Sequence, residues 1–178
     1  ESMYKTALNS SGITKGHVIV TSPTTATGES ALAGILKSYE VATGKEIPND
    51  VKEAANNEIY TQSEVVNNTN ISADDVANVV SQAKEEAAKQ NTTDTQTIIN
   101  IVNNIASNNN INITSTDASN LADSISQSQS VQDKANQYQN QVTDYVNSEG
   151  AQTLFSQIWN IIQSMLNGNT GSTTNTSN

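Results

Sequence analysis

One short stretch of this chain has the pattern of a β-strand, whereas the rest has the pattern of helices. Residues 16–22 read GHVIVTS, and Val18, Ile19 and Val20 form a continuous β-branched run that is typical of a strand covered on both faces. The backbone N–H and C=O groups of a strand need partners on a neighbouring strand. The partner comes from a region outside this sequence, from another copy of the chain, or from the weaker segment 111–113; we favour the first.

The second constraint is a helix with capping signals at both ends. Residues 26–47 read ATGESALAGILKSYEVATGKEI, in which Thr27 and Glu29 predict a helix start and Gly44 stands where a left-handed C-cap belongs. An apolar stripe at helical spacing runs between the caps, over Leu32, Ile35, Leu36 and Tyr39. We expect a buried helix whose polar residues serve capping rather than chemistry.

Further helical patterns precede and follow it. Helices are expected at residues 2–11 and 49–67, and two more are expected to start at Ser72 and at Thr93. A long helix is expected to start at Thr116 or Asp117, with a kink or break within residues 126–130. A last helix is expected after Gly150. The last helix carries the widest apolar face, made by Leu154, Phe155, Ile158, Trp159, Ile162, Met165 and Leu166.

These patterns predict a mainly α fold, α+β in the full-length protein. We expect a multi-helix bundle with one N-terminal strand near residues 16–22. Residues 1–47 form a helix–strand–helix segment, and 48–167 form a helical region that is packed on it as one domain or extended. Residues 168–178 contain no packing residue and are expected to be a disordered tail.

Composition excludes several classes of function. The formal net charge is −10, all eight basic residues are Lys, and Arg is absent, which argues against binding to nucleic acid or to anionic membrane surfaces. Without Cys, disulfides and thiolate metal sites are impossible. No apolar run approaches the ~20 residues of a membrane span. The chain begins at Glu1 without a signal peptide, so we expect a targeting segment that was removed or lies upstream.

Reactive constellations are also missing from the sequence. His17 is the single histidine, which rules out a multi-His metal site within one chain and suggests a role at the surface or at a sheet edge. Ser30 lacks the flanking pattern of a nucleophile elbow. The carboxylate pairs Asp74–Asp75 and Glu85–Glu86 are explained by the helix dipole and by pairing of Glu85 with Lys89. We therefore expect no catalytic residue, no cofactor and no metal.

The N-terminal quarter nevertheless resembles a known family. Ser11-Gly12-Ile13-Thr14, Val18-Ile19-Val20, Ser22-Pro23, Thr27-Gly28, Ala31-Leu32-Ala33-Gly34-Ile35, Tyr39-Glu40 and Ala42-Thr43-Gly44 are similar to the signature of the secreted bacterial family of unknown function 1002, the YpuA-like proteins. The resemblance implies an exported protein of Firmicutes type with an upstream region that carries further strands. It implies no catalytic residues.

Three functional hypotheses follow. The leading one is an exported or cell-surface structural or interaction protein without catalysis, which self-associates through its lone strand. The residues for such contacts are His17, Val18, Ile19 and Val20, together with Trp159 on the last helix. The second is a binding module for cell-wall glycan or peptide, and the third a hydrolase that uses carboxylates alone.

Overall fold

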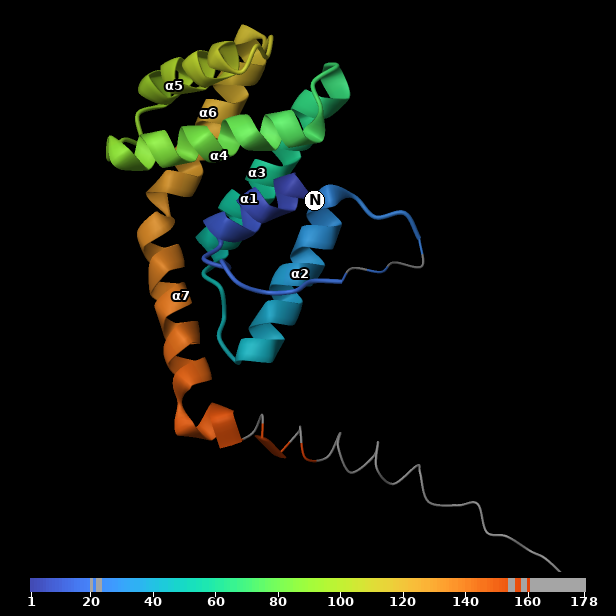
Figure 1. The fold of residues 1–178 in the computed structure, drawn as a ribbon, viewed down its shortest axis with the longest axis vertical. Coiled ribbons are helices and arrows are strands. Elements are labelled where there is room, and N and C mark those ends of the chain that lie inside the picture. Colours follow the sequence, from blue (N-terminus) through green and yellow to red (C-terminus); the bar gives the residue numbers. More distant parts are fainter. Residues whose placement is uncertain (20, 22–23, 154–155, 158–159, 161–178) are drawn as a thin grey trace, which may run out of the picture. The chain divides into compact units, whose positions relative to one another are not determined.

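The computed structural model describes residues 1–19, 21, 24–153, 156–157 and 160, and its regular elements are helices (Figure 1). They are α1 (Ser2–Ser10), α2 (Gly28–Thr43), α3 (Asn49–Asn68), α4 (Ala73–Lys89), α5 (Thr95–Asn108), α6 (Ser115–Ser130) and α7 (Gln132–Asn147), and residues 149–153 are helical as well. Two compact units, Glu1–Asn140 and Gln141–Asn178, divide the chain. None of the described helices is long and apolar enough to cross a membrane.

The predicted mainly α fold is confirmed, but the strand predicted near residues 16–22 is wrong for the part that is described. Residues 16–19 and 21 form a loop between α1 and α2, and residues 111–113 form the connection between α5 and α6. The β-branched run favours strand geometry, but a strand exists only where a neighbour completes its hydrogen bonds. Within the described residues neither segment has such a neighbour.

Side-chain caps define where most helices begin. Thr27 accepts the Ser30 N–H at 3.2 Å, and Gly44 ends α2 in the left-handed region with φ +62°, as predicted. Ser72 caps α4, also as predicted. The starts of α5 and α6 differ from the prediction because Asp94 and Thr114 cap them. The predicted break within 126–130 lies one residue later, at Val131, between α6 and α7.

A hydrophobic core joins α4, α5 and α6. Each helix contributes a stripe of apolar residues at helical spacing, and Val65 of α3 belongs to the same cluster. The cluster contains Val65, Val76, Val79, Val80, Ala83, Ala87, Ile98, Ile101, Val102, Ala106, Ala118, Leu121, Ala122 and Ile125. Burial of each larger side chain stabilises the fold by about 1.5–3 kcal/mol relative to exposure.

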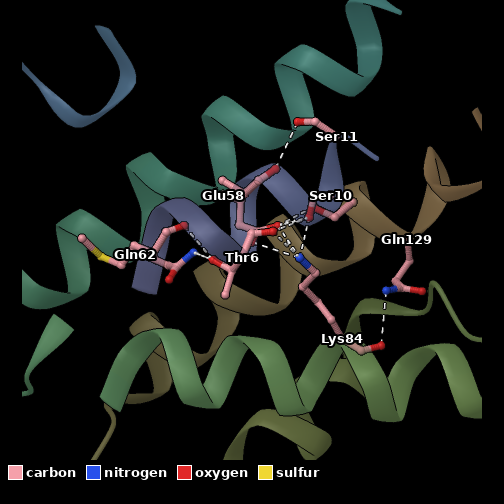
Figure 2. A network of polar contacts seen from close by, with 10 residues as sticks. Thr6, Ser10, Ser11, Glu58, Gln62, Lys84 and Gln129 are labelled. Carbon is pink, nitrogen blue, oxygen red and sulfur yellow. Dashed lines mark hydrogen bonds and ion pairs between the residues drawn. The ribbon is translucent and has the colours of Figure 1, made fainter. Parts of the chain in front are cut away.

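A buried ion pair holds four helices together (Figure 2). Glu58 of α3 is fully buried, and both of its carboxylate oxygens lie 3.1 Å from Nζ of Lys84 on α4. Ser10 of α1 and Ser128 of α6 donate to the same carboxylate at 2.6 and 2.9 Å. Lys84 also donates to the carbonyl oxygen of Thr6 at 2.9 Å. Helices α1 and α6 therefore both supply hydrogen bonds to the pair formed by α3 and α4.

The turn after α1 depends on a glycine. Gly12 has φ +75°, a region that residues with a Cβ rarely adopt, and the N–H of Ile13 closes the turn on the carbonyl of Leu8 at 2.9 Å. A Cβ on Gly12 would lie 2.3 Å from the carbonyl oxygen of Ala135. Gly12 therefore permits both the backbone conformation and the close approach of α7.

We predict that Lys84→Met lowers the free energy of unfolding by about 3–5 kcal/mol, because it leaves the Glu58 carboxylate buried without a cation. Urea unfolding followed by circular dichroism measures the loss. The double variant Glu58→Gln/Lys84→Met should be more stable than Lys84→Met alone, since its buried amide is neutral and still accepts from Ser10 and Ser128. A double variant that loses the sum of both single effects would contradict this coupling.

We predict opposite effects at two glycines. Gly12→Ala should destabilise the chain by more than about 1 kcal/mol, because its Cβ meets backbone and its φ is positive. Gly34→Ala, in the interior of α2 with no atom within 4 Å of the added Cβ, should stabilise it by about 0.5–1 kcal/mol. Urea unfolding of both variants is the measurement, and equal effects would show that backbone geometry at Gly12 is not limiting.

Candidate functional site

The residues predicted for intermolecular contact lie in the loop between α1 and α2. His17, Val18 and Ile19 are exposed there, with 46% of Val18 and 79% of Ile19 accessible to solvent. Val20 and Trp159 lie outside the described residues. No backbone group of residues 16–19 bonds to another described backbone group. Residues 16–19 therefore present apolar side chains together with backbone donors and acceptors that pair with no other described backbone group.

Two hollows border the loop. The larger, which we term the α2 groove, has a volume of about 720 Å³ and lies between the loop and the outward face of α2. The smaller, of about 530 Å³, lies towards α1 and is lined there by Tyr4 and Leu8. Both hollows share Gly16, His17 and Val18. Free space is thus available on either side of the loop.

Small side chains form the floor of the α2 groove. Ala31, Gly34, Ser38 and Ala42 lie along one face of α2 at spacings of three and four residues. Nothing lies within 4 Å of a Cβ built on Gly34. Only the stripe of Leu32, Ile35, Leu36 and Tyr39 was predicted from the sequence, and its Ile35 and Tyr39 also border the groove. The second stripe has the same helical spacing and could have been found.

The lining of the α2 groove is largely apolar. None of the groove-lining residues carries a carboxylate or an ammonium group. Ser30 is hydrogen-bonded to Thr27 at the helix cap, and Ser38 donates to the carbonyl of Gly34 at 2.8 Å. Burial raises the pKa of Tyr39, so its phenol stays protonated at neutral pH. The groove offers apolar surface and shape, and its titratable side chains are His17 and Tyr39.

The carboxylate pairs singled out in the sequence have structural partners. Asp74 accepts the Ser2 hydroxyl at 2.6 Å, and Asp75 accepts that of Ser72 at 2.8 Å. The predicted pairing of Glu85 with Lys89 is confirmed, with an N···O distance of 2.8 Å. Among the residues that the structure describes, no group of three or more His, Asp or Glu side chains is placed to hold a metal ion.

The buried cluster of Ser10, Lys84 and Glu58 was not predicted from the sequence. A hydroxyl beside an amine and a carboxylate is a combination that can generate a nucleophile. Here Ser10 is 1% exposed and Glu58 is fully buried, and neither hollow beside the 16–19 loop is lined by these side chains. The contacts that the structure gives this cluster join α1, α3, α4 and α6. Its signal in the sequence was a Glu on the buried stripe of α3.

Glu40, which belongs to the Tyr39-Glu40 part of the family signature, has a structural role. Its carboxylate is 6% exposed and accepts the Ile47 N–H at 3.0 Å and the Lys52 ammonium at 2.9 Å, while Lys37 lies 3.2 Å from its other oxygen. Burial raises the pKa of Glu40, but the hydrogen bonds from Lys52, from Ile47 and from Lys37 together outweigh burial and lower it. Glu40 thus fastens the end of α2 to the start of α3.

We predict that Glu40 stabilises the chain in a pH-dependent way. Because its pKa is lowered on folding, its contribution is present above the unfolded pKa of ~4.3 and is lost as the pH falls through the folded pKa. The difference in free energy of unfolding between wild type and Glu40→Gln should be constant near neutral pH and should shrink in acid. Urea titrations across pH 3–7 measure it, and a pH-independent difference would contradict the prediction.

Comparison with known proteins places the chain in a family without assigning it an activity. The model of the family described as "Protein of unknown function (DUF1002)" matches residues 1–145. Uncharacterized protein YpuA of Bacillus subtilis (strain 168) is 29% identical over 180 residues, which cover 93% of this chain and 61% of YpuA, so this chain spans under two thirds of its relative. No solved structure matches. Because the family model covers most of its length, this chain belongs to the DUF1002 family, as its N-terminal signature indicated.

Proposed function

We propose that this chain is an exported or cell-surface interaction protein that performs no catalysis and self-associates by strand addition at residues 16–19. One observation carries the proposal: Val18 and Ile19 are exposed, and the backbone groups of residues 16–19 bond to no other described backbone group. A strand that pairs with this loop would satisfy those groups and cover the two apolar side chains in one step. The exported setting is supported by the family resemblance alone.

The lining of the neighbouring hollow supports a binding role. The α2 groove contains apolar and small side chains and lacks carboxylates and ammonium groups. Such a surface binds an uncharged extended segment by burial of apolar area. The contact through Trp159 that the sequence suggested is retained as a further proposed element of the interaction.

A cell-wall ligand is the second candidate. Asn103, Asn110 and Asn112, with Ser107, line a polar hollow of about 430 Å³ between α5 and the connection to α6. Amide side chains both donate and accept hydrogen bonds, which suits the hydroxyl groups of a glycan or the backbone of a peptide. Retention on washed cell walls that is unaffected by Ile19→Lys would favour this candidate.

We predict that the chain self-associates with increasing concentration and that Ile19→Lys makes it monomeric, because a charge would be buried where the strands meet. Sedimentation velocity over a concentration series measures the association. Val41→Lys is the matched control, since Val41 is 74% exposed, compared with 79% for Ile19, but does not line the α2 groove. A wild-type chain that stays monomeric throughout the series would overturn self-association.

A further inference from the structure

We infer that the second copy is seated on α2, with the strand that adds to residues 16–19 occupying the α2 groove and resting over Gly34. This inference rests on the proposed self-association and names the surface and the partner that complete it. It assigns to the outward face of α2 a role that neither its caps nor its buried stripe requires.

The first observation that supports this inference is the free space above Gly34 in the interior of α2. A glycine in the interior of a helix costs about 0.5–1 kcal/mol relative to alanine. That cost is normally accepted where another group of the same chain comes close, but here a Cβ on Gly34 would meet no atom within 4 Å. Nothing within the described chain uses the space. A backbone from outside the chain would use it.

The position of the groove is the second argument. A strand paired with residues 16–19 would run about 4.8 Å from them. The larger hollow beside that loop has α2 as its floor, and Val18 and Ile19 line the hollow together with Gly34, Ser38 and Ala42. The incoming strand would therefore make backbone hydrogen bonds along one edge and lie against small side chains on the face below. The small floor allows a backbone to approach closely.

Charge and symmetry identify the occupant as a second copy. Residues 2–28 contain Lys5 and Lys15 but no Asp or Glu, although the whole chain has a net charge of −10 and Glu1 and Glu29 border the segment. Two copies that meet at residues 16–19 thus bring together a part of the chain that carries few carboxylates. Gly16, Val18 and Ile19 carry no charged side chain, which matches a groove without carboxylates or ammonium groups. Antiparallel pairing of this segment with itself gives a closed twofold dimer with identical contacts on both sides.

Antiparallel pairing would also cover the exposed apolar side chains of Val18 and Ile19. Side chains directly opposite one another on paired strands have Cβ atoms about 4.5–5.5 Å apart. The neighbouring strand and the floor of the α2 groove would thus cover Val18 of each copy. Ile19, which is 79% exposed and lines the same groove, would likewise be covered by the paired strand. The two Lys15 side chains would lie at opposite ends of the paired segment.

The test is Gly34→Leu, measured by sedimentation velocity on the chain alone. The added side chain has room in the monomer, and leucine is a better helix former than glycine, so the free energy of unfolding should not fall. The dimer should weaken by about tenfold or more, because the leucine fills the space that the strand needs. Ala33→Leu adds the same side chain to an exposed position of α2 that does not line the groove, and it should leave the association unchanged.

The outcomes separate this inference from the proposed function. If Ile19→Lys abolishes association while Gly34→Leu associates as the wild type does, strand addition stands and seating on α2 is overturned. If Gly34→Leu and Ala33→Leu weaken the dimer equally, the effect does not belong to the groove and the inference is also overturned. A wild-type chain that remains monomeric overturns both, because the second copy is then not the occupant.

Discussion

The buried ion pair of Glu58 and Lys84 is the contact on which the arrangement of the first unit depends. A carboxylate with no exposed surface is tolerated only when charge and hydrogen bonds replace the water it has lost. Lys84 supplies the charge, and hydroxyl groups from α1 and α6 supply hydrogen bonds. Apolar packing among α4, α5 and α6 allows many small adjustments, whereas this ion pair is satisfied in one arrangement of four helices.

The ion pair also determines where the exposed loop begins. Ser10 and Thr6 hold the end of α1 against α3 and α4, and Gly12 then turns the chain beside Ala135. At the other end of the loop, the Thr27 cap fixes the start of α2. The segment with Val18 and Ile19 is therefore anchored at both ends by specific contacts. Its exposure is a consequence of the fold around it.

The sequence predicted the helices well because their signals are local. Apolar residues three and four positions apart and capping side chains report on one helix at a time, and they placed α2 with its stripe and the start of α4 correctly. They failed where the deciding contact is distant. Glu58 and Lys84 are 26 residues apart, and Glu58 and Ser128 are 70 apart, so periodicity carries no signal for their meeting. At α5 and α6 the starts were misplaced because several neighbouring residues could cap.

The candidate contact residues were predicted in another conformation than the structure has. The β-branched run at 18–20 was predicted as a strand covered on both faces, whereas Val18 and Ile19 lie exposed in a loop. Their role in an intermolecular contact stays a prediction. A strand forms only when a second segment pairs with it, and the β-branched pattern reports on one segment alone.

Helix α2 carries two stripes of residues, one that is buried and one that faces outward. Leu32, Ile35 and Leu36 pack inward, and this burial together with Glu40 accounts for the cohesion of the helix with α3. The outward stripe of Ala31, Gly34, Ser38 and Ala42 adds nothing to that cohesion, and its glycine weakens the helix. In the proposed self-association, a further segment lies between the loop and this stripe and covers both.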